Sequence, residues 1–304
     1  MIGSFEQLIA NAGRLDGTSV IVAHPAGDAT FSAICEAQEK LGVRAILAGD
    51  RALIERGIQQ HGCDPASIEI LHTPDIRESL TACIKRSREG RNRILMKGGV
   101  DTATLMKAVL DESSGLRTGR LLSDVFLFEY PRREGNRFVM ITDGGITPAP
   151  DLRNKVDLIN NAVAVAHALG NEMPRVAVLS ATEHVTSRIP STLDAAALTE
   201  MNKRGEIRGC IVDGPLALDL AVSEESAAEK GIDSRVAGRA DILIAPNIET
   251  ANCLAKSTTY FAGYRLAHVI VGSTLPILIP SRTDKSDARF LSIALGMIVS
   301  GRSA

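Results

Sequence analysis

Short apolar runs alternate with longer segments of helical spacing over the first 130 residues of the chain. Within 28–41, apolar side chains recur every three or four positions, as one face of an α-helix requires. Strands separated by helices of this length predict βαβ units and a mostly parallel sheet covered on both faces. The strands are expected at 20–23, 43–48, 68–71 and 94–96, and the helices at 28–41, 50–58, 74–89 and 102–110.

A change of pattern separates this block from a second one. Two longer apolar runs, 122–128 and 137–141, are interpreted as strands joined by the polar turn 131–136. A second α/β block follows, and its first helix is expected to end near Gly170. Its strands are expected at 176–179, 210–212, 242–245 and 269–271, and its helices at 152–166, 194–203, 216–222 and 250–261.

The C-terminal stretch is expected to return to the first block. A strand at 277–279 ends at Pro280, and the helix at 288–300 is apolar enough to pack onto that block. We therefore predict an α/β fold with two α/β/α domains around a cleft. The first domain is discontinuous and comprises 1–138 and 275–304, and the second comprises 139–274.

Composition and charge narrow the class of protein. Apolar residues make up 45% of the 304 residues and aromatic residues only 3%, so the cores must be aliphatic. The formal net charge of −2 argues against a nucleic acid or a membrane surface as partner. Because we find neither a signal-peptide pattern nor an apolar run of membrane-spanning length, we expect a cytoplasmic protein.

The cysteines and histidines predict neither disulfides nor a metal site. The five cysteines contain no C-x-x-C pair, and reduced thiols are expected. The six histidines are scattered without the spacing of zinc ligands, so no metal is expected.

The most informative chemical signal lies near the C-terminus. The strand that ends at Pro280 delivers Ser281 and Arg282 to the start of a helix, where a hydroxyl, a guanidinium and unsatisfied N–H groups surround one point. This arrangement predicts an anion site. Asp284 and Asp287 follow within one turn as potential proton acceptors. Alternatively, Asp284 caps the helix and Asp287 only occupies its first turn.

Two basic segments that contain glycine are further candidates for anion binding. Lys97 and Gly98 stand where a strand gives way to a helix, and glycine lets the backbone approach a ligand closely. Arg117 lies in the glycine-flanked loop 115–120, and arginine binds phosphate in a bidentate manner. The alternatives are a glycine turn with a solvated lysine and a basic turn in solvent.

Polar residues after other apolar runs are weaker candidates. Asp143, and Asp213 with Gly214, are placed where the carboxyl ends of strands in such a sheet face a ligand crevice. An Asp-Gly pair is otherwise an ordinary turn. His24 and His184 also follow strands and could act as acid or base, but a polar loop histidine is the more common outcome.

Together these segments resemble the phosphate acetyl/butyryltransferase family, and its butyryltransferase branch more closely. The match runs from about residue 90 to the C-terminus, and the first 90 residues fit only in general pattern. The matching stretches are MKG at 96–98, KAVL at 107–110, GLRTGRL at 115–121, ITD at 141–143, GEIRGCIVDGPLALD at 205–219, ADIL at 240–243 and SRTD at 281–284.

The resemblance implies transfer of a short acyl group between coenzyme A and inorganic phosphate, the fold of isocitrate and isopropylmalate dehydrogenases, and a homodimer. It implies no metal or redox cofactor. It also implies that Ser281 and Arg282 contact phosphoryl oxygens and that Lys107 stands at the position of a family arginine. In acetyl-transferring relatives a later carboxylate is the base toward the thiol. The spacing differs here, so either Asp287 or Asp284 could take that role, and Asp287 is slightly favoured.

Two other functions are compatible with this fold. A metal-dependent dehydrogenase or decarboxylase could recruit Asp213, Asp219 and Asp241, although no nicotinamide fingerprint is recognisable. A non-catalytic protein that binds acyl-coenzyme A or acyl phosphate is the other alternative, and the presence of Ser281 and Arg282 argues against it.

Overall fold

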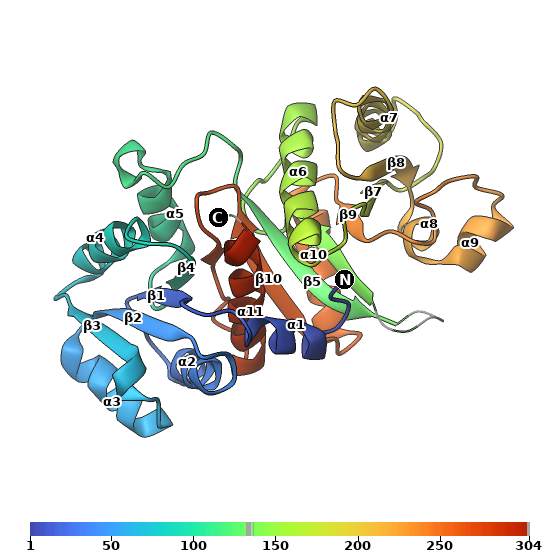
Figure 1. The fold of residues 1–304 in the computed structure, drawn as a ribbon. Coiled ribbons are helices and arrows are strands. Elements are labelled where there is room, and N and C mark those ends of the chain that lie inside the picture. The colour runs from blue at the N-terminus through green and yellow to red at the C-terminus, as the bar shows by residue number, and fades with distance from the viewer. Residues whose placement is uncertain (132–134, 136, 303–304) are drawn as a thin grey trace. The chain divides into compact units, whose positions relative to one another are not determined.

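The computed structural model describes residues 1–131, 135 and 137–302 and divides the chain into two compact units (Figure 1). The first unit consists of Phe5–Arg120 and Leu266–Ala304, and the second of Met1–Ser4 and Leu121–Arg265. The predicted polar turn 131–136 lies mostly outside the described residues.

The sheet of the first unit has the strand order β3-β2-β1-β4-β11-β10. Every neighbouring pair is parallel except the last, in which β10 runs antiparallel to β11. The carboxyl ends of the five parallel strands therefore meet at one edge, which we call the carboxyl edge. The strands are β1 (Ser19–Ala23), β2 (Arg44–Gly49), β3 (Ile68–His72), β4 (Arg93–Lys97), β10 (Leu266–Val271) and β11 (Ile277–Leu278).

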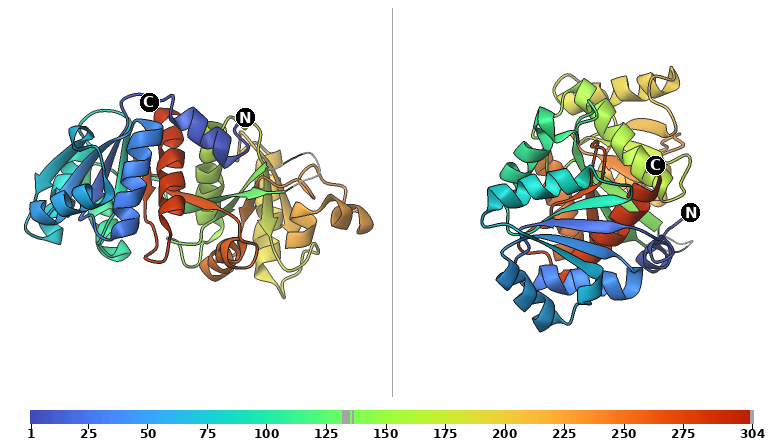
Figure 2. Two further views of the ribbon diagram at one scale, coloured as in Figure 1. Left: turned by 90° about the horizontal axis from the view of Figure 1, so that it is seen from below. Right: turned by 60° about the vertical axis from the view of Figure 1, so that its left-hand side comes forward.

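Helices cover both faces of this sheet. The C-terminal helix packs against α2, α1, β10 and β4, which is the return to the first block that its apolar character predicts. Figure 2 shows α2 and α11 side by side, and α4 lies with α5 over the opposite face. The helices are α1 (Phe5–Ala12), α2 (Asp28–Leu41), α3 (Arg51–His61), α4 (Ile76–Ser87), α5 (Thr102–Leu110) and α11 (Ser286–Arg302), with 3-10 turns at η1 (Pro65–Ser67) and η2 (Glu112–Ser114).

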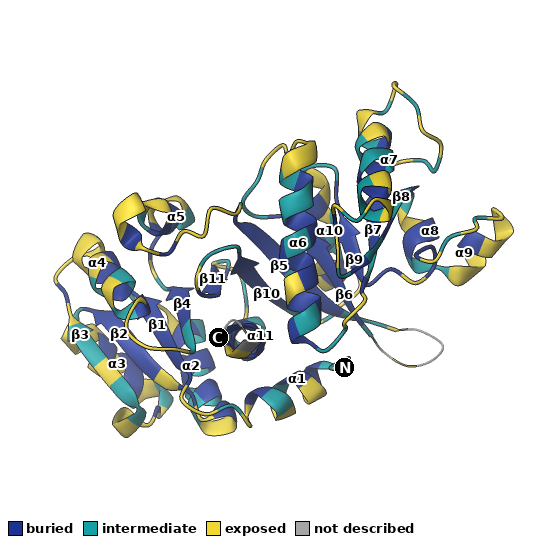
Figure 3. Cartoon of the chain, turned by 45° about the horizontal axis from the view of Figure 1, so that its top comes forward, coloured by how far each residue is buried: buried dark blue, intermediate teal, exposed yellow. Residues whose placement is uncertain are grey.

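Local sequence explains where several of these elements begin and end. Asp50 caps α3 as predicted, because its side chain accepts a hydrogen bond from the Leu53 N–H at 2.9 Å. Gly42 follows α2 with φ 65°, a left-handed conformation that glycine adopts without strain. The core is aliphatic, as composition requires: β1 is buried along its whole length, and so is most of the inner face of α11 (Figure 3).

The second unit has a sheet of order β5-β6-β9-β7-β8. The first pair is antiparallel and the others are parallel. Helices α6 and α10 lie on opposite faces of this sheet (Figure 2). The elements are β5 (Ser123–Tyr130), β6 (Arg137–Thr142), α6 (Leu152–Ala168), β7 (Arg175–Leu179), α7 (Pro190–Lys203), β8 (Ile211–Leu216), α8 (Leu218–Val222), α9 (Glu224–Glu229), β9 (Ile242–Ile244) and α10 (Ile248–Tyr260).

The unit boundaries differ from the domain boundaries predicted at 138/139 and 274/275. Strand β5 pairs with β6 over residues 126–130 and 137–141, and this ladder keeps β5 in the second unit. Strand β10 pairs with β11 and packs on α11, which places residues from Leu266 onward in the first unit. Sequence pattern shows strands but not their partners, so it could not locate these junctions.

Helices α1 and α9 were not predicted. Helix α1 has 8 residues and buries only one stripe, Phe5, Leu8 and Ala12. Helix α9 has 6 residues and is started by Ser223, whose hydroxyl accepts a hydrogen bond from the Ser226 N–H. Helices this short give too few periods for the pattern to be recognised.

The prediction that all cysteines are reduced is wrong for one pair. Cys35 of α2 and Cys63, which follows α3, form a disulfide with a Cα–Cα distance of 4.6 Å. They are 28 positions apart in sequence, and only the packing of α3 against α2 brings them together. Cys83, Cys210 and Cys253 are free.

None of the helices in the described part of the chain combines the length and the apolarity that a membrane span needs.

The disulfide predicts a simple thiol count. Unfolded without reductant, the protein should react with a chromogenic thiol reagent at three sites, and at five sites after reduction, since two of the five cysteines are paired. The double variant Cys35→Ser/Cys63→Ser should lose about 3 kcal/mol of unfolding free energy in the loop-entropy account. Five reactive thiols before reduction would contradict the assignment.

Candidate anion site at the carboxyl edge of the first unit

Three predicted site segments meet at the carboxyl edge of the first unit. Lys97 is the last residue of β4, and β4 lies between β1 and β11 in the sheet. Ser281 follows β11 by three residues, and His24 directly follows β1. Because neighbouring strands lie about 4.8 Å apart, these three residues lie along a short stretch of one edge. Such an edge is the usual ligand site of a parallel α/β sheet.

The segment from Ser281 to Asp284 forms a tight turn. The Asp284 N–H donates to the Ser281 carbonyl at 3.2 Å, and Asp284 Oδ2 accepts from the Ser281 N–H at 2.7 Å. Asp284 thus closes the turn from both sides and does not cap α11, which starts at Ser286. Between them Arg282 is exposed.

The carboxylate of Asp284 also lies close to a buried histidine. His268 of β10 is 5% exposed, and its Nε2 lies 3.7 Å from Asp284 Oδ2. Burial alone would raise the pKa of Asp284, but the hydrogen bond and charge of His268 and the Ser281 N–H together lower it below its ordinary value. The carboxylate is therefore held ionised, as part of the framework of the turn.

Arg289, which sequence reasoning missed, supports the turn from within. This residue of α11 is only 8% exposed. Its Nη2 donates to the Ser281 carbonyl at 2.9 Å and its Nε to the Asp284 carbonyl at 3.3 Å. Its Nη1 donates to Thr30 Oγ1 of α2 at 3.0 Å. One planar guanidinium therefore ties both ends of the turn to a second helix, which a lysine could not do.

Lys97 is buried in the same neighbourhood. It is 7% exposed, and its Nζ lies 3.4 Å from Thr102 Oγ1, at the start of α5. Burial lowers the pKa of Lys97, and the positive charges of Arg289 and Arg282 lower it further. The opposing effect of the Asp284 charge is smaller. An ammonium crowded by two guanidinium groups is stabilised by an anion.

Gly98 is required by the close approach of two backbones. Its N–H donates to the Ala23 carbonyl at 3.0 Å. A Cβ at this position would lie 2.4 Å from the His24 carbonyl oxygen and 2.6 Å from that of Ala23. Both are backbone atoms, so only glycine fits without moving a strand. The sequence located this glycine, but its structural role is contact with β1.

Asp287 lies in the first turn of α11 and is half-buried. Its charge acts on Lys40 of α2 and contributes to the raised pKa of that lysine, whose largest cause is Glu36. The charges that act on Lys97 include those of Asp284 and Asp101. Of the two predicted carboxylates, Asp284 is thus the one whose charge reaches the lysine.

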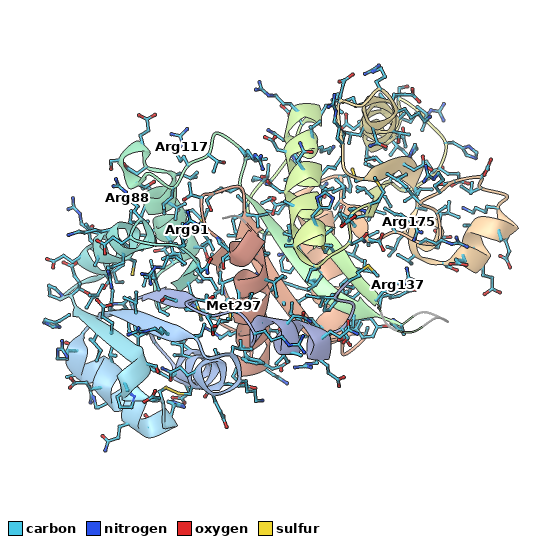
Figure 4. All side chains as sticks on the ribbon, in the orientation of Figure 1. Arg88, Arg91, Arg117, Arg137, Arg175 and Met297 are labelled. Carbon is cyan, nitrogen blue, oxygen red and sulfur yellow. A yellow bond between two sulfur atoms is a disulfide. The ribbon has the colours of Figure 1, made fainter. Side chains whose placement is uncertain are left out.

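Two other predicted residues of this unit are not gathered at this point. Arg117 forms a bridge to Ser273, beyond β10, at the edge where β4 begins and not where it ends. Arg88 lies against Gly115 nearby (Figure 4). Lys107 is an exposed residue in the last turn of α5, which starts beside Lys97 and runs away from it.

In the second unit, Asp143 follows β6 as predicted, but its carboxylate is already fully bonded. Its two oxygens accept hydrogen bonds at 2.8–3.1 Å from four backbone N–H groups, those of Asp124, Gly145, Ile146 and Thr147. Burial is the main reason that the pKa of Asp143 is raised. Its evident role is to shape the loop after β6.

Asp213 and Gly214 lie inside β8, not at its end, which corrects their predicted placement. Asp213 accepts hydrogen bonds from the Gly214 N–H and from the Ser234 hydroxyl. A Cβ on Gly214 would lie 2.7 Å from the Val178 carbonyl oxygen, so glycine is needed for the contact with β7. Asp213 also lines a cavity of about 640 Å³ with basic residues Lys203, Arg208 and Arg235.

The carboxylates suggested for a metal-dependent dehydrogenase do not assemble. Asp241 precedes β9, and its Oδ2 accepts from the Arg175 N–H at 2.9 Å, whereas Asp219 lies in α8. Among the described residues, no three or more His, Cys, Asp or Glu side chains are grouped so that they could hold a metal ion.

A helix-covered parallel sheet with a lysine and a Ser-Arg turn at its carboxyl edge is the arrangement expected of an α/β protein with a small-anion site. The model of one family, described as "Phosphate acetyl/butaryl transferase", matches residues 80–297. The chain belongs to this family, which confirms the resemblance seen in the sequence.

Relatives that match nearly the whole chain also support membership of this family. The chain is 39% identical over 301 residues to "Phosphate butyryltransferase" of Clostridium acetobutylicum, covering 99% of each chain. It is 39% identical over 294 residues to "Phosphate acetyltransferase" of Thermotoga maritima, covering 97% of this chain and 99% of the relative. The crystal structure of a branched-chain phosphotransacylase from Enterococcus faecalis V583 superimposes with TM-score 0.82 at 28% identity, covering 93% of this chain and 99% of that one.

The support given by Arg289 can be tested through stability. Arg289→Ala leaves two carbonyl oxygens and the Thr30 hydroxyl without their donor, and should lower the unfolding free energy by about 3 kcal/mol. Arg56→Ala, at an exposed position of α3, is the matched control and should change it by less than about 0.5 kcal/mol. Urea denaturation measures both. Equal stability of the two variants would contradict the role of Arg289.

The lowered pKa of Asp284 predicts a pH-dependent contribution to stability. Its pKa is lower in the folded than in the unfolded state, so the contribution is complete above the ordinary value of 3.8 and is lost as pH falls through the lowered value. Asp284→Asn should cost about 1–3 kcal/mol at pH 7. The difference from wild type should shrink below about pH 4, while the exposed control Asp16→Asn shows none. A difference that is unchanged at pH 2 would contradict this assignment.

Proposed function

We propose that this chain catalyses the reversible transfer of a short acyl group between coenzyme A and inorganic phosphate, and that the transfer takes place at the carboxyl edge of the first unit. The observation that carries the site assignment is the Ser281–Asp284 turn, held by Arg289 on the same edge as buried Lys97. Family membership and full-length relatives support the reaction.

The chemistry requires a place for a multiply charged anion. Toward acyl phosphate, a phosphate oxygen attacks the thioester carbonyl carbon, a C–O bond forms, and the C–S bond breaks with release of the thiolate. In reverse, the thiolate attacks the acyl phosphate carbonyl and phosphate leaves. In both directions negative charge passes between phosphate, the carbonyl oxygen and sulfur. Lys97 and Arg282 supply positive charge, and the Ser281 hydroxyl supplies a hydrogen-bond donor.

The choice of base between the two aspartates follows from how each is held. Asp284 closes the turn and is kept ionised by His268 and the Ser281 N–H, so a lowered pKa makes it a weak proton acceptor. We therefore assign Asp284 to the framework and retain Asp287 as the proposed base toward the thiol.

The similar proteins do not identify the acyl group that this chain transfers. The relatives at 39% identity carry butyryl and acetyl names, and the similar crystal structure is that of a branched-chain enzyme. We extend the proposal to a homodimer, which the family resemblance suggests and which light scattering of the purified protein would test. We also propose that the protein is cytoplasmic.

Release of coenzyme A from acetyl-, butyryl- and isobutyryl-coenzyme A, followed with a thiol reagent, tests the proposal directly. Release should require phosphate, and Arg282→Ala should lower kcat/KM by about 100- to 1000-fold, as removal of one charge-stabilising donor does in other enzymes. Arg282→Lys should recover part of the loss. The exposed control Arg56→Ala should stay within about twofold of wild type. Release without phosphate, or an undiminished Arg282→Ala, would refute the assignment.

A further inference from the structure

We propose that His24 is a substrate-binding residue, whose Nδ1 donates a hydrogen bond to the phosphoryl group held at Lys97. This inference rests on the proposed function and gives His24, which the sequence raised only as a possible acid or base, a role in binding phosphate. It starts from the position of His24, which directly follows β1 at the carboxyl edge, one strand from Lys97 of β4.

The backbone of His24 is held in an uncommon conformation. Its φ is 54°, in the left-handed region, which few residues other than glycine occupy. The conformation is imposed from both neighbouring strands: the His24 N–H donates to the Ala48 carbonyl at 2.8 Å, and the His24 carbonyl accepts from the Gly99 N–H at 2.6 Å. Residues other than glycine that are held in this region cluster at functional sites, where the surrounding structure over-determines them.

The ring of His24 has an unmet hydrogen-bonding atom. Its Nδ1 is enclosed from solvent and has no hydrogen-bond partner among the residues that the structure describes. Such an atom costs about 1–3 kcal/mol, and a native structure retains one where a ligand or water completes the bond. An imidazole nitrogen without a partner thus follows β1, whose last residue pairs in register with Lys97 of β4.

The packing around the ring explains why it stays at this edge. A Cβ on Gly99 would lie 3.2 Å from His24 Cδ2, so the ring lies close to Gly99. A larger residue at Gly99 would displace the ring, and one at Gly98 would displace the His24 backbone. The two glycines therefore let the segment that follows Lys97 pack closely against His24.

Phosphate binding, measured apart from turnover, gives the primary test. Affinity for inorganic phosphate, followed by calorimetry, should fall about 10- to 100-fold in His24→Ala, the range for one hydrogen bond to a charged group. His24→Asn should recover most of the loss, because asparagine tolerates the left-handed backbone and places its amide nitrogen near the Nδ1 position. The matched control is His72→Ala, at the end of β3, which should bind phosphate as wild type does.

Kinetics distinguish this role from a structural one. In acyl transfer, His24→Ala should raise KM for phosphate by the same factor and change KM for acyl-coenzyme A by less than twofold. Wild-type phosphate affinity in His24→Ala would overturn the proposal, as would His24→Asn binding as weakly as His24→Ala. Equal increases in both KM values together with a lower Tm would show that His24 only maintains the fold. Absence of acyl transfer by the wild type would refute the proposed function, while calorimetry would still decide the role of His24.

Discussion

The candidate site depends on one buried guanidinium. A turn of four residues has little stability of its own, because its backbone groups can bond to water equally well in other conformations. Arg289 removes that freedom by donating to the carbonyls of Ser281 and Asp284 and, through its third nitrogen, to Thr30 of α2. The turn thereby becomes part of the helical layer of the first unit, and Arg282 projects from a rigid base.

This framework places the positive charges of two arginines near the buried ammonium of Lys97. The charges of Arg282 and Arg289 act on Lys97, and the charge of Asp284 offsets only part of their effect. Burial is the largest cause of the lowered pKa of Lys97, and the two arginine charges lower it further. A bound phosphate would oppose this lowering, because its charge favours the ammonium form and replaces the water that burial removes. The charged groups are thus preorganised to bind an anion before any ligand is present.

The sequence predicts the fold class well, and the site in part. Periodicity identified the alternating strands and helices of the first unit, and the Ser281–Arg282 pair was visible because it follows a strand and precedes a helix. Arg289 was not visible, since nothing local indicates that a charged residue in an apolar helix folds back onto carbonyl groups. Cys35 and Cys63 are joined only through the packing of α3 against α2.

Placement along a strand was the other source of error. Asp213-Gly214-Pro215 has the composition of a turn, yet it lies within β8, where Gly214 permits close contact with β7. Arg117 has the composition of a phosphate loop, yet it lies at the edge opposite Lys97. Sequence indicates which residues flank strands, whereas strand direction and neighbours decide which of them meet.

A crystal structure of the protein soaked with inorganic phosphate would test the central claim most directly. We expect phosphate oxygens within about 2.7–3.2 Å of Lys97 Nζ, the Ser281 hydroxyl and the Arg282 guanidinium. Phosphate bound at another place, with Arg282 directed away from Lys97, would contradict it.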